Sequence, residues 1–230
     1  MLGIIGAMEV EVNQIKAELE NVTVTVKAGM EFNRGTLNSK EIVIVRSGIG
    51  KVNAGICAQI LCDLFNVSAI INTGIAGSLK DEIDIGDIVL SEDALQHDLD
   101  AVAFGYDLGV IPQMDTSVFK GDDKLIELAK DACDKVCKDI HYFVGRVVSG
   151  DQFISDKEKK NFLIRTFKGY CTEMEGAAIA QAAYLNNVPF LIVRSISDKA
   201  DDSAHMDYPE FEAKAVANSV KLINEIVANY

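Results

Sequence analysis

A fully apolar run, residues 189–193 (Pro-Phe-Leu-Ile-Val), constrains the fold of this chain more than any other feature. A run without polar alternation is typical of a strand buried on both faces, and such strands occur in sheets that helices cover on both sides. Other strand patterns alternate with helical patterns along the chain, and no internal repeat or linker divides them. The sequence therefore predicts an α/β protein, a three-layer α/β/α sandwich with a central mixed sheet, formed by residues 1–230 as a single domain.

The other predicted elements follow from the same reasoning about periodicity. Residues 22–27 (Val-Thr-Val-Thr-Val-Lys) alternate strictly, as a half-exposed strand does. Further strands are expected at 2–7, 31–37, 41–46, 67–73, 86–91 and 143–149. Helices are expected to begin near residue 10, after residue 51, at Asp122 or Asp123, at Ser155 or Asp156, after Glu175, and at Tyr208, where the last one continues to Tyr230.

Composition excludes several classes of partner and site. The net charge of -13 would repel nucleic acid and anionic membranes. The amino terminus lacks the pattern of a signal peptide, and no apolar run approaches the roughly 20 residues of a membrane span, so we expect a cytoplasmic protein. The five cysteines form no Cys-x-x-Cys motif and lie near no histidine, which indicates neither disulfides nor a metal site. Cys133 and Cys137 are expected to face the core.

Two glycine-rich segments are candidates for ligand contact. Residues 47–51 (Ser-Gly-Ile-Gly-Lys) lack the third glycine of a dinucleotide-binding motif and the Gly-Lys-Ser/Thr of a P-loop, so they indicate a tight turn beside a ligand cleft. Residues 74–78 follow a predicted core strand, where open α/β sheets bind ligands. The group His97, Asp98 and Asp100 favours surface hydrogen bonding over metal binding.

Acidic residues follow several predicted strands. Glutamates at a helix start also have an electrostatic explanation, because the helix dipole favours negative charge there. Carboxyl groups gathered at one sheet edge, however, have pKa values pushed apart, and one protonated and one ionised carboxyl is what glycosidic bond cleavage requires. The residues concerned are Glu9, Glu11, Glu173, Glu175 and Asp198, with Arg194 nearby.

Six segments together resemble one family. They are Gly-Ile-Ile-Gly-Ala-Met-Glu-Val-Glu (3–11), Ser-Gly-Ile-Gly-Lys-Val-Asn-Ala (47–54), Ile-Asn-Thr-Gly-Ile-Ala-Gly (71–77), Ser-Gly-Asp-Gln-Phe-Ile (149–154), Glu-Met-Glu (173–175) and Arg-Ser-Ile-Ser-Asp (194–198). In this order and spacing they resemble the bacterial 5′-methylthioadenosine/S-adenosylhomocysteine nucleosidases of the purine nucleoside phosphorylase-like superfamily. Each motif alone is weak, but six over nearly the whole chain are highly specific.

The resemblance implies roles for residues at the matching positions. Asp198, held by Ser197, would protonate N7 of adenine as the base leaves. Glu11 would be the general base for the attacking water, with Arg194 helping to orient it. Glu175 would hold the ribose hydroxyls together with the Met174 backbone.

The resemblance also implies how the rest of a nucleoside would be held, without a metal or cofactor. From its loop position, Phe153 could lie either at the edge of the core or in a site where a flat ligand stacks on it. The resemblance implies that adenine stacks on Phe153, and that the Ile154 backbone contacts the edge of the base beside Ala76 and Gly77. Met8, Ile49 and Tyr208 would line the alkylthio pocket. Phe104 and Pro112 would reach in from the neighbouring subunit of a homodimer.

Two positions depart from the family pattern, and three alternatives to the implied activity stay open. Ile75 stands where several relatives carry Ser near the attacking water, and Ala101 stands where Val is common. Both leave the substrate preference open. The alternatives are a phosphorylase of the same fold, a futalosine-like hydrolase, and a nucleoside-binding protein without activity. A carboxylate at Glu11 argues against phosphorolysis because it repels phosphate.

Overall fold

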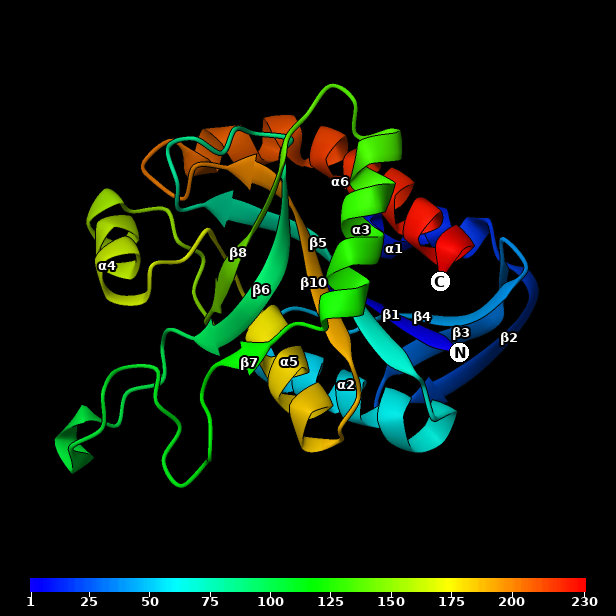
Figure 1. The fold of residues 1–230 in the computed structure, drawn as a ribbon, viewed down its shortest axis with the longest axis horizontal. Coiled ribbons are helices and arrows are strands. Elements are labelled where there is room, and N and C mark those ends of the chain that lie inside the picture. Colours follow the sequence, from blue (N-terminus) through cyan, green and yellow to red (C-terminus); the bar gives the residue numbers. More distant parts are fainter.

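A computed structural model describes residues 1–230, except for the side chains of residues 205–207, 209 and 210. Strands and helices alternate along most of the chain (Figure 1). The first half contains β1 (Leu2–Gly6), α1 (Glu9–Ala17), β2 (Glu20–Lys27), β3 (Met30–Leu37), β4 (Lys40–Arg46), α2 (Lys51–Phe65), β5 (Ala69–Ser78), β6 (Ile88–Gln96) and the short 3₁₀ helix η1 (Val102–Phe104). The second half contains β7 (Phe119–Lys120), α3 (Asp123–Val136), β8 (Tyr142–Ser149), α4 (Lys157–Phe167), β9 (Cys171–Glu173), α5 (Gly176–Leu185), β10 (Phe190–Asp198) and α6 (Ala204–Asn229).

The strands form one mixed sheet in the order β10-β6-β8-β9-β5-β1-β4-β3-β2, with β7 paired to β6. Because β10 pairs with β5 as well as with β6, the strands β10, β6, β8, β9 and β5 close into a ring. The β5–β10 pairing is parallel, so the carboxyl ends of both strands lie at the same edge. This closure brings the segments that follow residues 73 and 193 side by side.

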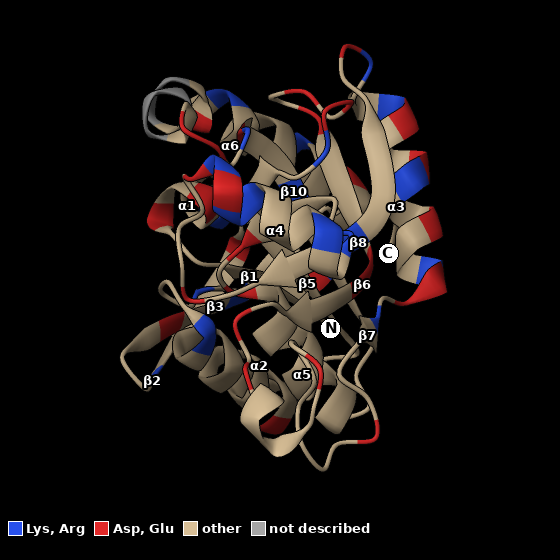
Figure 2. Ribbon diagram, turned by 90° about the vertical axis from the view of Figure 1, so that its left-hand side faces the viewer, with Lys and Arg blue, Asp and Glu red and all other residues tan. Residues whose placement is uncertain are grey.

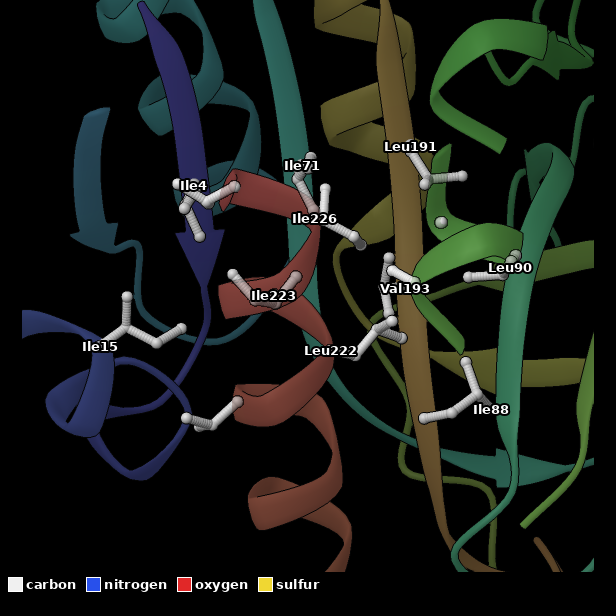
Figure 3. Close-up of a cluster of buried hydrophobic side chains, with 14 of the residues drawn as sticks. Ile4, Ile15, Ile71, Ile88, Leu90, Leu191, Val193, Leu222, Ile223 and Ile226 are labelled. Carbon is white, nitrogen blue, oxygen red and sulfur yellow. The ribbon is translucent and has the colours of Figure 1, made fainter. Parts of the chain in front are cut away.

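Helices cover the sheet on both faces, which confirms the predicted α/β/α architecture (Figure 1). Helices α1, α3 and α6 pack on one face and α2 and α5 on the other. Figure 3 shows the hydrophobic core between the sheet and the helices α1, α3 and α6. In it, Leu222, Ile223 and Ile226 of α6 lie against side chains of β1, β5 and β10. All nine residues of β10 are buried, which confirms the prediction for residues 190–193 of the apolar run, while Pro189 before the strand is exposed.

Most charged side chains of α3 lie on its outer surface. Figure 2 shows acidic and basic residues interspersed along α3, whose apolar stripe faces the core. The carboxylate of Asp122 accepts hydrogen bonds from the Lys124 and Leu125 amides and so begins this helix, while Asp156 begins α4 in the same way. No helix in the described part of the chain combines the length and apolar character that a membrane crossing requires.

Several predicted boundaries were wrong, among them those of the strand expected at 86–91, since β6 runs from Ile88 to Gln96. Strands β5 and β10 do not end at residues 73 and 193 but continue to Ser78 and Asp198, because their small residues allow the parallel pairing to persist. Helix α6 begins at Ala204 rather than at Tyr208. Strand β2 is exposed on both faces rather than one, since it is the last strand of the sheet and pairs only with β3.

All five cysteines are free. Cys57 on α2, Cys133 on α3 and Cys171 on β9 are buried in the layers that these elements form, and Cys137 is buried at the end of α3. The prediction that Cys133 and Cys137 face the core is confirmed.

Candidate active site

A cavity of about 480 Å³ opens where the carboxyl ends of β5 and β10 meet the amino-terminal ends of α1 and α5. Its volume suits a ligand of nucleoside size. Its lining residues are Ala7, Met8, Glu11, Ile49, Ile75, Ala76, Gly77, Phe153, Thr172, Glu173, Met174, Glu175, Ser197, Asp198 and Tyr208. The wall is therefore mostly apolar, with a small number of carboxyl groups.

Glu11 lies in the first turn of α1, and its carboxylate turns back toward the chain that precedes the helix. Oε2 accepts hydrogen bonds from the Ala7 amide (2.7 Å) and the Met8 amide (2.8 Å), and Oε1 accepts one from the Ile75 amide (3.2 Å). Burial raises the pKa of Glu11, although the Arg194 charge and these three amides act against the increase. The result is a carboxyl group that is fixed in orientation and whose pKa lies above its ordinary value.

Glu173 and Glu175 lie at the junction of β9 and α5, as the sequence predicts, but they have different partners. Glu173 accepts hydrogen bonds from the Ser149 hydroxyl and from the amides of Glu175 (3.1 Å) and Gly176 (2.7 Å), and it forms an ion pair with Arg194. Its carboxylate therefore begins α5 and is neutralised by a buried cation.

Glu175 has a weaker set of partners. Its Oε1 accepts a hydrogen bond from the Gly50 amide (2.8 Å), while Oε2 lies 3.8 Å from Nη2 of Arg194. Burial and then the neighbouring Glu173 charge raise the pKa of Glu175 to about 7, against the effects of Arg194 and the Gly50 amide. This carboxyl group can change its protonation state at neutral pH.

Arg194 is a buried cation beneath the cavity rather than part of its wall. Its Nη2 donates to Glu173 and to Oδ1 of Asn72 (2.5 Å). The prediction that Arg194 accompanies Glu11 has a geometric basis, because Nη1 of Arg194 and Oε1 of Glu11 both approach Gly74 of β5. A Cβ atom at that position would lie 2.1 Å from the first and 2.5 Å from the second. Only glycine leaves room for this pair.

Asp198 is the last residue of β10 and lines a different part of the cavity wall from Glu11. Its Oδ2 accepts a hydrogen bond from the Ser197 hydroxyl (2.9 Å), as predicted, and its Oδ1 accepts one from the Ala200 amide (2.8 Å). A Cβ atom at Gly77 would lie 2.8 Å from Oδ1 of Asp198. Asp198 therefore contacts β5 three residues beyond the point that Glu11 contacts, about 10 Å at the usual strand rise.

The apolar part of the cavity is formed by side chains from separate segments. Phe153, half-exposed between β8 and α4, and Tyr208 of α6 make an edge-to-face contact with ring centres 5.9 Å apart. The Tyr208 hydroxyl donates to Sδ of Met8 (3.4 Å). Ile49 is in the turn before α2, where the glycine-rich segment 47–51 forms the predicted turn beside a cleft.

Most of the residues predicted for the site line this cavity, and five do not. Ile154 turns its side chain into a core cluster with Leu79 and Leu163, so only its backbone is available to a ligand. Phe104 is 85% exposed in η1, and Pro112 lies in the following loop; neither lines the cavity of its own chain. Arg194 is buried beneath the cavity and does not line it. Ala101, expected at the pocket, is buried in the same loop as Phe104 and also lies outside the lining.

Sequence reasoning missed three lining residues and misread one histidine. Ala7, Thr172 and Glu173 had no assigned place in the cavity, although Glu173 stood in the Glu-Met-Glu motif. His97 is buried rather than at the surface, and neither ring nitrogen has a hydrogen-bond partner among the described atoms. Burial lowers the pKa of His97. Asp98 pairs with Lys51 (2.5 Å). Among the described side chains, no group of His, Cys, Asp or Glu is arranged to hold a metal ion.

A model of the phosphorylase superfamily matches residues 1–228. A curated relative from Halalkalibacterium halodurans, a 5′-methylthioadenosine/S-adenosylhomocysteine nucleosidase, is 44% identical over 227 residues, which is 98% of this chain and 97% of the relative. The chain belongs to this nucleosidase family. A nucleosidase structure from Neisseria meningitidis in complex with methylthio-immucillin-A has a TM-score of 0.95 and 37% identity over 100% of this chain and 99% of that one.

The nucleosidase family also has a close structural neighbour with another substrate. A futalosine hydrolase from Helicobacter pylori has a TM-score of 0.94 and 33% identity, covering 100% of this chain and 97% of that one. The fold alone therefore does not separate these two hydrolases.

Proposed function

We propose that this protein hydrolyses the N-glycosidic bond of 5′-methylthioadenosine and S-adenosylhomocysteine, and also of 5′-deoxyadenosine. The products are adenine and the 5-substituted ribose, which suits methionine salvage and the recycling of S-adenosylmethionine by-products. One observation carries the proposal: Glu11, Glu175 and Asp198 line a single cavity of nucleoside size, each buried and each held by a different set of hydrogen bonds.

Asp198 is the general acid in this proposal. Adenine is a poor leaving group as an anion, so protonation at N7 lowers the barrier to departure from an oxocarbenium-like ribose. The Ser197 hydroxyl and the Ala200 amide each bind one carboxyl oxygen of Asp198, and this fixes the orientation of the group. A positioned proton transfer of this kind contributes roughly 10²- to 10⁴-fold to the rate.

Glu11 is the general base that activates water. The three backbone amides that bind its carboxylate hold the group in one orientation at the cavity wall, which supports this role, and burial raises its pKa. Arg194 acts on Glu11 through its charge and holds Glu173 in place. Ile75, where several relatives carry Ser, offers no hydroxyl to the water, so its positioning depends on Glu11, Glu175 and Arg194.

The remaining lining residues bind the parts of the nucleoside. Glu175 accepts hydrogen bonds from the ribose hydroxyls, which the Met174 backbone also helps to hold. Phe153 stacks on adenine, and the Ile154 backbone reads the base edge beside Ala76 and Gly77. Met8, Ile49 and Tyr208 surround the 5′ alkylthio group.

A second subunit completes the 5′ end of the cavity. We infer a cytoplasmic homodimer in which Phe104 and Pro112 of one chain reach the cavity of the other. The exposure of Phe104 supports this, because a phenylalanine 85% exposed next to exposed Val102 is an apolar surface that favours burial against a partner.

The deciding experiment incubates the protein with methylthioadenosine, S-adenosylhomocysteine and futalosine, each with and without phosphate. For each nucleoside that is hydrolysed we expect release of its free base, adenine from methylthioadenosine and S-adenosylhomocysteine and hypoxanthine from futalosine, together with the free 5-substituted ribose, at a rate independent of phosphate. Release that requires phosphate would support a phosphorylase, preferred cleavage of futalosine would support the related hydrolase, and binding without turnover would leave a nucleoside-binding protein.

A further inference from the structure

The amino-terminal end of α2 is capped by residues from distant parts of the chain. Gly50, at the cap position, has no side chain, and the first amides of a helix need external acceptors. The Gly50 amide donates to Oε1 of Glu175 (2.8 Å), and the Lys51 amide donates to Oδ1 of Asp151 (2.8 Å). Two successive amides of one turn therefore bind a cavity carboxylate and Asp151.

Asp151 is itself fixed by a closed set of hydrogen bonds. Its amide donates to Oδ2 of Asp98 (2.9 Å), and Oδ1 of Asp98 pairs with Nζ of Lys51 (2.5 Å), which also donates to Gln96 (2.9 Å). The Lys51 amide donates to the Asp151 side chain, so these hydrogen bonds link Lys51, Asp98 and Asp151 in a closed ring. The segments around residues 50, 98 and 151 therefore cannot move independently.

The conformation of Gly50 adds to this constraint. Its φ of 96° is in the region that favours glycine, and a Cβ atom there would lie 3.1 Å from Oδ1 of Asp151. The turn is therefore shaped to bring the Gly50 amide toward Glu175 while Asp151 approaches from the other side.

We propose that Asp151 is a positioning residue, which holds the first turn of α2 through the Lys51 amide and thereby keeps the Gly50 amide directed at Glu175. The inference deepens the proposed function, since it rests on the role of Glu175 in binding ribose. Asp151 does not line the cavity and does not contact the substrate in this scheme. It acts on ribose binding only through the orientation of Glu175.

A charge-matched pair of variants tests this proposal. Asp151→Asn keeps an oxygen that accepts from the Lys51 amide, because asparagine is as good a helix cap as aspartate, whereas Asp151→Ala removes the acceptor. Both remove the same charge. We expect D151A to raise KM for methylthioadenosine about fivefold with a smaller decrease in kcat, the effect of losing one hydrogen bond. D151N should restore KM to within about twofold of the unchanged protein.

A measurement on the unliganded protein separates this inference from the proposed function. The pKa of Glu175, followed by NMR of carboxyl-labelled glutamate, should be higher in D151A than in D151N, since the Gly50 amide lowers it. Glu11, Glu173 and Arg194, which also act on Glu175, are the same in both variants. If the unchanged protein shows no hydrolysis, the proposed function fails, but this titration still tests the contact.

Asp122→Ala is the matched control, because Asp122 caps α3 far from the cavity residues. It should lower the melting temperature about as much as D151A does and leave KM unchanged. Asp151 is exposed, so D151A is expected to fold, and its melting curve checks this. Equal KM and equal Glu175 pKa values in D151A and D151N would overturn the proposal. So would an effect of D151A on KM that persists at full size when Glu175 is replaced by alanine, which removes the acceptor of the Gly50 amide.

Discussion

Glu173 and Glu175 are separated by one residue and differ in how their charge is compensated. Glu173 is paired with Arg194 and binds two amides of α5, whereas Glu175 has one amide and lies 3.8 Å from the guanidinium. One arginine thus neutralises the first carboxylate and only partly compensates the second. Glu175, at the proposed ribose position, is therefore partly protonated at neutral pH. The incomplete compensation of its charge lowers the stability of the folded protein.

The pH dependence of stability follows from the raised pKa of Glu175, about 7 against 4.5 in the unfolded chain. A carboxyl group with a raised folded-state pKa binds its proton more tightly in the folded state. Its contribution to stability is therefore fully present below pH 4.5 and is lost as the pH rises through 7. At about 1.4 kcal/mol for each tenfold change in the dissociation constant, the loss is up to about 3 kcal/mol.

Glu175→Gln, which cannot ionise, should escape this loss. Relative to the unchanged protein, we expect the variant to gain up to about 3 kcal/mol of unfolding free energy between pH 5 and pH 8. It should at the same time bind and cleave methylthioadenosine poorly. Urea denaturation of both proteins at several pH values measures the difference, and a difference that does not change with pH would contradict the assignment. Glu82→Gln, at an exposed carboxyl outside the cavity, serves as the control.

Asp198→Asn tests the general acid. Asparagine keeps the size of the side chain and can still bind the Ser197 hydroxyl and the Ala200 amide, but it has no proton to donate to N7. We expect kcat to fall by roughly 10²- to 10⁴-fold, with the Kd for methylthioadenosine, measured by calorimetry, changed much less. Near-normal turnover would sink the assignment. Asp123→Asn, exposed on α3, should behave like the unchanged protein.

The sequence identifies the carboxylates of the site but not how they divide their tasks. Motif spacing places Glu11, Glu175 and Asp198 correctly in one cavity. Glu173 could not be recognised as the partner of Arg194, because a helix-start glutamate has the same local pattern whether or not a buried cation reaches it. His97 is a similar case, since its burial depends on the packing of Gly150 and Phe167 against it.

At the scale of elements, the parallel pairing of β5 and β10 determines where the site lies. Because both strands continue beyond their apolar segments, Gly74 pairs with Arg194, and Glu11 of α1 enters above them. Ile75, Ala76, Gly77, Ser197 and Asp198 are strand residues, so the part of the site that they form is restricted by the sheet.

Gly74→Ala tests how closely these elements must approach. The added Cβ would lie 2.1 Å from Nη1 of Arg194 and 2.5 Å from Oε1 of Glu11, so at least one of them must move. We expect a loss of at least 10²-fold in kcat/KM and a destabilisation of about 1–3 kcal/mol. Gly55→Ala, within α2 and with no atom within 4 Å of the added Cβ, should be neutral or stabilising by up to about 1 kcal/mol. Equal effects of the two substitutions would contradict this account.

Periodicity predicts the elements better than their ends. The amphipathic pattern of α3 and its cap at Asp122 were both recognisable, and so were the strands β2 and β3. The extensions of β5 and β10 were not, because glycine and serine favour strands weakly and only the neighbouring strand holds them extended. Strand β9, with three residues, is too short to show a period.

At the scale of the whole molecule, the cavity is incomplete within one chain if Phe104 belongs to it. Phe104→Ala should then raise KM for methylthioadenosine about tenfold, the effect of losing one apolar contact. Val26→Ala, at an exposed position of β2, should not.

Mixing two inactive or weakened variants tests whether the phenylalanine comes from the partner. A heterodimer of Phe104→Ala and Asp198→Asn chains contains one site with both residues intact. Recovery of normal KM and part of the activity in the mixture is expected for exchange of Phe104 between subunits. A mixture whose activity equals the sum of its components would contradict the arrangement, and sedimentation equilibrium would show whether dimers form.

The buried cysteines can be used to measure local opening of the folded protein. Burial raises the pKa of Cys57 and Cys171, so neither reacts with a thiol reagent until its surroundings open. Cys57 reports on the α2 layer, and Cys171 lies two residues from Glu173 on the strand that carries the site. The labelling rates of the two cysteines, read by mass spectrometry, therefore compare local opening at the site with opening of a helical layer in the same sample. A nucleoside that binds the site should slow the labelling of Cys171 at least as much as that of Cys57.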